Sequence, residues 1–520
     1  MSSTTATPQA PAPADLAPLK GAALLLAGFL LAIGNFMVVL DMTIANVSVP
    51  NIAGGLAVSS SQGTWVITSY SVAEAIVVPL TGWLAQRFGA VKVFILGMLG
   101  FGICSALCGL APSLGFLVLF RVMQGLCGGP IMPMSQTLMM RIFPPHLRGQ
   151  AMGIWAMTTV VAPIAGPILG GVICDNAGWP WIFYINVPVA AICGFFAYRT
   201  FVGRDTPIEK RPFDLVGLIL LVVFVGSLQI MLDRGKELDW FSSPTIITLA
   251  CVAVVGFLAF LIWELTAKDP IVNLRVFRHP GFRIAVITIS LTFGSFFASI
   301  VLVPLWLQVN LGYTAAWAGY VAAWGGVLAV VMSPIVPRLM QKFDLRILVS
   351  FGVLWLAMVS FIRAGLNTNA TYWNVSLPFI AQGLAMPFFF IPTTALALSS
   401  VQPQETASAA GLSNFLRTLS AAFATALVTT LWENNGNRNH ETLASTLPNP
   451  EGTLKTLTDN GFSLDQALNQ LDGLTTSQAV MLATDEMFRI TAVAFVIAAV
   501  VIWLAPKPKM GGNPMGGGGH

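Results

Sequence analysis

Runs of apolar residues recur along almost the whole chain, and they constrain its fold more than any other feature. A helix needs about 20 such residues to cross the ~30 Å hydrocarbon layer of a membrane. Only 9% of the residues are charged, whereas a soluble domain carries about 25%. We therefore predict an all-α integral membrane protein with fourteen spans, at residues 22–49, 62–85, 93–112, 114–138, 149–173, 181–201, 213–232, 244–265, 282–304, 316–336, 347–366, 375–399, 406–432 and 487–505.

The positive charges between the spans indicate the orientation of the chain. If the N-terminus is cytoplasmic, nearly all loop lysines and arginines fall on the inner side, and the short outer loops hold only Arg234, Lys236 and Arg363. Cytoplasmic loops carry such an excess of positive charge. Fourteen spans with N- and C-termini in the cytoplasm follow, and residues 1–19 and the Gly-rich residues 507–520 are expected to be disordered cytoplasmic tails.

Residues 433–485 form the one long hydrophilic segment, and the predicted orientation places them outside the membrane. Ser463 and Gln466 have the spacing of a capping box, and Leu464, Leu468 and Leu471 follow at helical spacing. One interpretation is a short helix packed on the outer face of the protein. The other is a docking surface for a partner protein.

An internal repeat indicates two related halves. Residues 79–88 align without gaps to residues 334–343, at an offset of 255 residues. Gln124-Gly125-Leu126 recurs as Gln382-Gly383-Leu384, 258 residues later. Two six-helix bundles at 20–205 and 281–506, with two additional helices at 206–280, are therefore predicted. Like halves around a cavity at the middle of the membrane are typical of secondary transporters.

Several kinds of chemistry are disfavoured by the sequence. The six cysteines lie in or beside apolar runs without metal-binding spacing, so we expect buried free thiols and no metal site. No phosphate-binding loop of an ATPase occurs, and none of the four histidines lies in a predicted span. An enzyme or ATP-driven machine is therefore not expected, and no cofactor is predicted.

Charged residues inside spans are costly and usually functional, and three of them fall at a similar depth in the first half. Asp41, Glu74 and Arg121 lie roughly 12–18 Å from the outer ends of their helices, at ~1.5 Å per residue. Burial and a neighbouring arginine act in opposite senses on the protonation of a carboxylate, which is the balance that a proton carrier needs. We hypothesise that Asp41 and Glu74 carry protons and that Arg121 tunes them. The alternative is a static ion pair.

Two other features concern conformational change. Arg417 lies within the thirteenth span, with Asn414 one turn before it, and it is expected to hydrogen-bond helix ends or carbonyl groups rather than to couple protons. In the fifth span, Pro167 is expected to kink the helix. The small residues around it predict either tight packing or a seal between the two halves; the gating candidates in this span are Pro163, Gly166, Pro167 and Gly170.

At these residues the chain resembles the fourteen-span, EmrB-type drug:proton antiporters of the major facilitator superfamily, over about residues 20–506. Leu40–Pro50 and Trp181–Pro188 resemble motifs of that group, and Arg121–Gly125 resembles its fourth-helix motif. Residues 162–171 resemble the fifth-helix signature of exporters. Residues 82–92 resemble the loop between the second and third helices, with Gln86 where the family has Asp. The resemblance adds Gly82, Arg87 and Gly89 to the gating candidates.

The resemblance implies proton-driven efflux of lipophilic drugs or toxic compounds across the bacterial inner membrane, powered by the proton gradient. It also implies a periplasmic membrane-fusion adaptor and an outer-membrane channel as partners. The main alternative is a proton-coupled carrier of one physiological compound, such as a siderophore or a lipid-like metabolite; a receptor-like role on the same fold is a more distant one. A cavity for such substrates should contain aromatic and adaptable side chains, and the candidates are Tyr70, Gln124, Met157, Phe296, Trp324 and Phe389.

Overall fold

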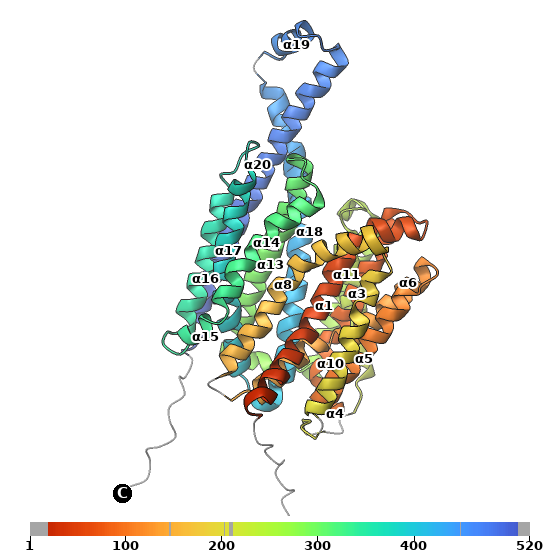
Figure 1. The fold of residues 1–520 in the computed structure, drawn as a ribbon, viewed down its shortest axis with the longest axis vertical. Coiled ribbons are helices and arrows are strands. Elements are labelled where there is room, and N and C mark those ends of the chain that lie inside the picture. The colour runs from red at the N-terminus through yellow and green to blue at the C-terminus, as the bar shows by residue number, and fades with distance from the viewer. Residues whose placement is uncertain are drawn as a thin grey trace, which may run out of the picture.

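A computed structural model describes residues 19–144, 147–201, 203–206, 208, 212–447 and 449–507 of the chain. Within these ranges the regular structure is helical, and the helices run side by side as an elongated bundle (Figure 1). The predicted tails, 1–19 and 507–520, lie outside the described residues apart from Leu19 and Lys507, and so does His146.

The first half contains six spans, several of them built from two or three consecutive helices. Its elements are α1 (Gly21–Gly55), α2 (Ser60–Gly63), α3 (Trp65–Val77), η1 (Val78–Leu80), α4 (Thr81–Phe88), α5 (Ala90–Gly109), α6 (Leu114–Gly128), α7 (Ile131–Ile142), α8 (Arg148–Ala177), α9 (Trp181–Tyr184) and α10 (Asn186–Phe201).

Two additional helices and the second half follow. The additional pair is α11 (Leu215–Arg234) and α12 (Pro244–Thr266), which pack on each other, with α11 also against α3. The second half is α13 (Pro280–Asn310), α14 (Ala315–Met332), α15 (Val336–Leu339), α16 (Leu345–Arg363), α17 (Tyr372–Ser399), α18 (Thr406–Thr446), α19 (Pro450–Asp459) and α20 (Leu464–Val501). The short helices between them are η3 (Trp240–Ser242), η4 (Leu274–Arg278), η5 (Pro403–Glu405) and η6 (Ile502–Leu504).

The number of membrane spans is compatible with the predicted fourteen. Among the described residues, 12 helices are long and apolar enough to cross a membrane, and α8 makes a thirteenth if its bent parts are one span. The remaining predicted span corresponds to α14, whose apolar stretch Trp317–Met332 is shorter. The bend in α8 is 43° between Arg148–Pro163 and Ala165–Ala177, one turn before Pro167. A proline clashes with the carbonyl four residues earlier, so the predicted kink is confirmed.

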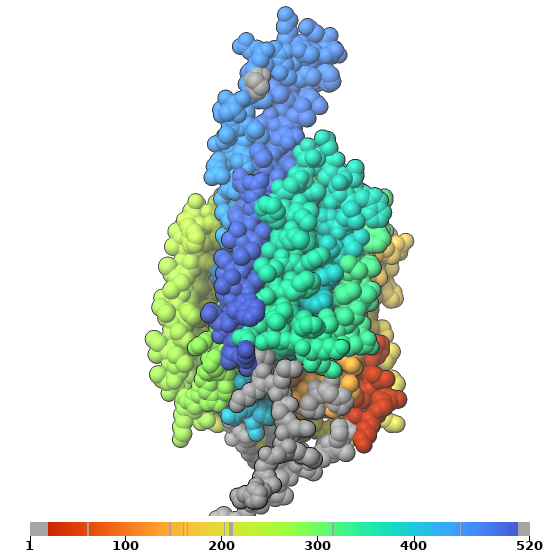
Figure 2. Space-filling view, turned by 90° about the vertical axis from the view of Figure 1, so that its left-hand side faces the viewer, coloured from red at the N-terminus to blue at the C-terminus, as the bar shows by residue number. Residues whose placement is uncertain are grey.

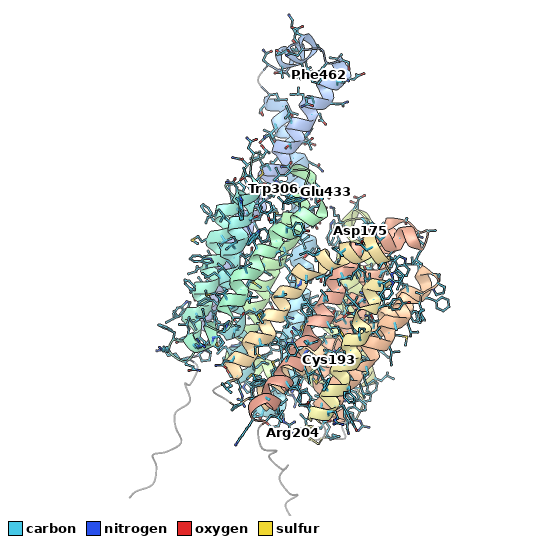
Figure 3. All side chains as sticks on the ribbon, in the orientation of Figure 1. Asp175, Cys193, Arg204, Trp306, Glu433 and Phe462 are labelled. Carbon is cyan, nitrogen blue, oxygen red and sulfur yellow. The ribbon has the colours of Figure 1, made fainter. Side chains whose placement is uncertain are left out.

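Residues 433–485 do not form a short helix packed on the outer face, which was one of the two interpretations of this segment. Instead, α18 and α20 continue beyond the bundle as a helical hairpin, with α19 at its tip (Figure 1). Figure 3 shows Glu433 near the base of this hairpin and Phe462 near its tip. The capping box at Ser463 is confirmed, but it begins a 38-residue helix. Polar contacts such as Trp432 to Thr484 hold the two arms together, which explains why helices continue where the chain turns hydrophilic.

The opposite end of the bundle carries the positively charged loops. Arg204 lies there in Figure 3, and α4 and α15, which contain Arg87 and Arg338, lie there in Figure 1. We call this the basic end and the other the hairpin end. The helix α1 begins and α20 ends at the basic end, so the described parts of both chain ends lie on one side of the membrane.

Candidate functional site

Asp41 and Arg121 form an ion pair in the interior of the first half. The Nη1 atom of Arg121 lies 2.5 Å from Oδ2 of Asp41, and both side chains are buried. Arg121 also donates through Nε to the Val66 carbonyl at 3.0 Å. The predicted convergence of the first and fourth spans is therefore confirmed. A buried pair of this kind persists because each charge would be costly alone.

Two further polar side chains donate hydrogen bonds to the Asp41 carboxylate. Gln124 and Asn186 donate to its Oδ1 at 3.1 and 2.8 Å. Gln124 also accepts a 2.9 Å hydrogen bond from Arg121. Gln124 thus belongs to the ion-pair cluster and not to a substrate cavity. With three donors, Asp41 is well satisfied as a carboxylate.

Tyr70 also belongs to this cluster. The guanidinium of Arg121 lies 4.3 Å from the centre of its ring, and the tyrosine is 1% exposed. Its hydroxyl has no hydrogen-bond partner among the described residues. The prediction that Tyr70 binds substrate is not supported by its position, because the side chain is enclosed within the first half.

Glu74 is buried but differs from Asp41 in its surroundings. Among the described residues, the Glu74 carboxylate has no hydrogen bond and no ion pair, unlike that of Asp41. It interacts electrostatically with Arg417 of α18, which belongs to the second half, and with Arg121 and Asp41 of its own half. The interaction of Glu74 with a charge of the opposite half was not indicated by the sequence.

Arg417 contacts aromatic rings and not the carbonyl groups that we predicted. Its guanidinium lies 4.8 Å from the ring centre of Phe293 and 5.4 Å from that of Phe390. Its Nη2 is 2.7 Å from the sulfur of Met132 in α7, and its Nε has no partner among the described residues. Cation–π contacts replace hydrogen bonds here because aromatic residues line this part of the second half.

A cavity of about 60 Å³ lies between α8 and the second half. Its wall is mostly aromatic and aliphatic, with a few polar groups, as is usual for sites that bind lipophilic molecules. The lining residues are Thr159, Pro163, Phe293, Phe296, Phe297, Ile300, Ala322, Gly325, Phe379, Gln382, Gly383 and Met386.

Of the six predicted substrate residues, only Phe296 lines this cavity. Phe389 is fully buried against Phe390, and the indole of Trp324 donates to the Tyr372 hydroxyl at 3.0 Å. Met157 is half-buried in α8, outside the cavity wall. Their role in substrate binding stays a prediction. The sequence could not identify the residues of this cavity, because a helix that is apolar on all sides gives no periodic signal for the face that borders a cavity.

The halves are in close contact at the basic end. A Cβ atom added to Gly82 would collide with Ser408, and one added to Gly411 would lie 2.8 Å from the Val78 carbonyl oxygen. A Cβ atom at Gly153 would lie 2.9 Å from the Ser333 carbonyl oxygen. These glycines allow backbones of opposite halves to touch. The basic end is therefore closed in this structure, and Gly82 lies in this contact; its gating role stays a prediction.

Unlike Gly153, Gly166 and Gly170 of α8 do not contribute to this closure. A Cβ atom at Gly166 would collide with Thr43 of α1, and one at Gly170 would lie 3.3 Å from the Ile44 carbonyl oxygen. Both contacts are within the first half, so the tight-packing alternative describes these residues. Pro163 instead lines the cavity.

The loop after α4 is organised by a carboxylate from elsewhere in the chain. Asp205 accepts hydrogen bonds from the backbone amides of Val91 at 3.0 Å and Lys92 at 3.3 Å, at the start of α5. Gly89 has φ +92°, and a Cβ atom there would collide with that carboxylate. Arg87 lies half-buried in the last turn of α4. Asp205 thus supplies a negative charge beside this loop, in which Gln86 stands where the resembled family has Asp.

The cysteines are free, as predicted, but not all are buried. Cys104, Cys108 and Cys193 are buried, whereas Cys127 and Cys174 are partly exposed and Cys251 is exposed. Cys251 lies on α12, which is at the periphery of the bundle. An apolar run facing lipid and one facing protein have the same composition, which explains the difference.

Arg363 is the functional candidate that the sequence analysis missed. It was assigned to an outer loop, yet it is the last residue of α16 and is 2% exposed. Its guanidinium stacks 4.2 Å from the ring centre of Phe379. Arg363 could have been identified from the sequence, because it lies inside the predicted span 347–366.

Comparisons with known proteins agree with this architecture. The model of the Major Facilitator Superfamily matches residues 31–425. The chain is 44% identical over 512 residues to the multidrug export protein EmrB of Escherichia coli (strain K12), covering 97% of this chain and 99% of that protein. It is also 44% identical over 510 residues to the fatty acid resistance protein FarB of Neisseria gonorrhoeae, covering 97% and 100%.

Solved structures show the same fold at low sequence identity. The proton:xylose symporter XylE has a TM-score of 0.58 at 14% identity, covering 93% of this chain and 96% of that one. The human organic anion transporter MFSD10 has a TM-score of 0.56 at 13% identity, covering 92% and 100%. The fold, the spans and the relatives are those of a multi-pass protein of the bacterial inner membrane. The chain is a transporter and belongs to the Major Facilitator Superfamily.

Proposed function

We propose that this transporter exports lipophilic drugs or toxic compounds from the cell in exchange for protons. The observation that carries the proposal is Glu74, a buried carboxylate of the first half that interacts electrostatically with Arg417 of the second half. An aromatic cavity borders the same boundary. The relatives named for multidrug export and fatty acid resistance cover almost the whole chain.

The coupling step follows from the charges. Opposite charges attract strongly in a poorly hydrated interior. When Glu74 is ionised, its attraction to Arg417 holds the halves together at this level. When Glu74 takes up a proton, that attraction is lost and opening between the halves becomes easier. A ligand that binds one state better than another shifts the population, and here the ligand is the proton.

Asp41 has a different part in this scheme. Two side-chain amides and one guanidinium hold its carboxylate, so releasing it requires the cluster of Arg121, Gln124 and Asn186 to rearrange. Glu74 has no such donors among the described residues. Glu74 is therefore the group that exchanges its proton in the conformation closed at the basic end, and Asp41 exchanges its proton in another conformation.

Reconstituted vesicles test the proposal. Drug efflux driven by a pH gradient is measured for the wild type, Asp41→Asn and Glu74→Gln, with Glu451→Gln on the exposed α19 as the matched control. Both interior variants are expected to lose gradient-driven transport, while the control keeps it. If both retain wild-type proton-coupled efflux, the assignment fails.

A dedicated export substrate is the second candidate. The relative named for fatty acid resistance favours a lipid-like compound. A broad panel of compounds tested for susceptibility in a pump-deficient strain separates the two. Protection against many unrelated compounds supports multidrug export, and protection against one chemical class supports a dedicated exporter.

The hairpin of α18, α19 and α20 supports a further part of the proposal, a periplasmic membrane-fusion adaptor working with an outer-membrane channel. The hairpin projects from the bundle at the end opposite the basic end (Figure 2). With the basic end in the cytoplasm, as the positive charges of its loops favour, the hairpin lies in the periplasm. Phe462, Leu464 and Leu468 are 43%, 59% and 45% exposed near its tip. Exposed apolar side chains on a projecting element outside the membrane are typical of an interaction site.

Copurification tests this partnership. A deletion within 443–472 and the double substitution Leu464→Gln/Leu468→Gln are compared with Asp465→Asn, an exposed polar change on the same helix. The first two are expected to abolish copurification with a candidate adaptor. Unchanged copurification of the deletion variant rules the docking site out.

A further inference from the structure

The buried charges of the spans differ in how they are compensated. Asp41 and Arg121 form an ion pair, and Glu74 interacts electrostatically with Arg417. Glu264 on the peripheral α12 accepts a hydrogen bond from the Val272 amide. Arg363 of α16 has no acidic partner among the described residues, although it is 2% exposed.

The surroundings of Arg363 compensate its charge only in part. Its guanidinium lies 4.2 Å from the ring centre of Phe379 and 6.0 Å from that of Phe488. Its Nε and Nη2 atoms have no hydrogen-bond partner within the described part of the chain. Cation–π contacts and the negative end of α16 favour a cation at this place. A buried guanidinium, however, normally has its donors matched by a carboxylate or phosphate.

Phe379 connects this arginine to the cavity. The same ring that lies under the guanidinium is part of the cavity wall. Gln382, one turn further along α17, also lines the cavity, and its Oε1 has no donor among the described residues. Arg363 is not itself part of the cavity wall; it lies behind the Phe379 ring, beside the polar edge formed by Gln382. Phe293, Phe296 and Phe297 supply the aromatic part of the wall.

We propose that Arg363 is an anion-recognition residue of this cavity and that the transporter prefers amphipathic anions to neutral molecules of the same shape. The apolar body of such a molecule rests against the phenylalanine wall. Its anionic group reaches the unpaired donors of Arg363 when the Phe379 ring turns aside, and Gln382 offers its amide beside them. The inference rests on the proposed function, because it takes the cavity as the substrate site.

A matched set of fluorescent probes tests the proposal on the purified full-length protein. The acid 1-pyrenebutyrate and its amide, 1-pyrenebutanamide, share the same apolar body and differ in charge. The wild type is expected to bind the acid at least about tenfold more tightly than the amide, because a charge-assisted hydrogen bond is gained. Arg363→Met removes the donors but keeps an apolar side chain on Phe379. It should bring the ratio of acid affinity to amide affinity close to one, and it should leave the affinity for the amide unchanged. Arg489→Met, an exposed change on α20 beside Phe488, serves as the matched control and should keep the wild-type ratio.

The outcomes separate recognition from packing. Equal weakening of acid and amide in Arg363→Met shows that Arg363 is a packing residue and overturns the inference. A wild-type protein that binds both probes equally overturns it without any variant, so the test does not depend on the folding of Arg363→Met. Gradient-driven transport without a preference for the acid keeps the proposed function and rejects this inference. A fourth outcome combines two results: Arg363→Met loses the preference for the acid, and the wild type shows no gradient-driven transport. It supports the recognition site and rejects the proton coupling.

Discussion

Asn414 of α18 donates a 2.7 Å hydrogen bond to the side-chain oxygen of Gln136 in α7 and so joins the second half to the first. Both residues are buried, and Asn414 also donates to the Ala410 carbonyl at 2.8 Å, one turn earlier in its own helix. The side-chain nitrogen of Asn414 thus donates two hydrogen bonds in this conformation. Its predicted role in conformational change now has a specific partner in the opposite half.

Gln136→Leu is expected to weaken closure at the basic end. The net contribution of a hydrogen bond is ~1 kcal/mol, which corresponds to about a fivefold shift toward conformations open at this end. Spin labels at Phe88 and Ile347, both exposed at the basic end of opposite halves, report the change as a longer distance between them. Thr248→Ala, on the exposed side of α12, is the control. An unchanged distance distribution would show that this hydrogen bond does not hold the halves together.

Gly411→Val is expected to have a larger effect in the same direction. Its Cβ atom would lie 2.8 Å from the backbone oxygen of Val78, which cannot rotate away as a side chain can. Overpacking costs about 1–3 kcal/mol, and here the strain is relieved by separating the halves. Gly226→Val, on α11 with nothing within 4 Å of the added atom, should leave both the label distances and transport unchanged. Wild-type distances in Gly411→Val argue against a tight seal at this contact.

The spans could be predicted from the sequence because a membrane demands a fixed length of apolar helix. The hairpin could not, since the hydrophilic ends of α18 and α20 carry no hydropathy signal, although the capping box at Ser463 was found correctly. α14 was predicted as a full span and is a shorter apolar helix.

The candidate site was predictable where charge decides the contact. Charged side chains inside the membrane are costly unless they are paired, and Asp41 and Arg121 lie at a similar depth, so their ion pair could be expected. The cavity wall was not predictable, because Phe293 and Phe389 occupy equally apolar helices and only the packing of those helices distinguishes them. Arg363 was misassigned since a charge at the end of an apolar run is usually solvated.

The pH dependence of stability should include a contribution from Asp344 at the basic end, outside the spans. The Arg346 side chain donates hydrogen bonds to it and holds the pKa of Asp344 below its usual value. A carboxylate whose pKa is lower in the folded state stabilises the fold above its unfolded pKa of about 3.9, and this stabilisation is lost as the pH falls through the folded value.

Asp344→Asn isolates this effect, because asparagine can still cap α16 but carries no charge. The difference in thermal stability between wild type and variant should be constant above about pH 5 and should shrink below about pH 4. Asp269→Asn, an exposed change in the loop after α12, is the control and should show no such difference. A difference that grows as the pH falls contradicts the assignment.

Asp41→Asn and Glu74→Gln should differ in their effect on stability, even though both are expected to abolish proton coupling. Asp41→Asn leaves Arg121 buried without its counter-charge, and breaking a buried pair in this way costs about 3–5 kcal/mol. Glu74→Gln removes a carboxylate that has no hydrogen-bond donor among the described residues, so its loss of stability should be clearly smaller.

The double variant Asp41→Asn/Arg121→Gln provides the decisive comparison. Removing both charges replaces the ion pair by neutral amides, so the double variant should be more stable than the sum of the single losses predicts. Thermal unfolding of the four proteins in one detergent measures this coupling directly. Additive losses would mean that Asp41 and Arg121 do not stabilise each other, and the cluster would then be held by Gln124 and Asn186 rather than by its charges.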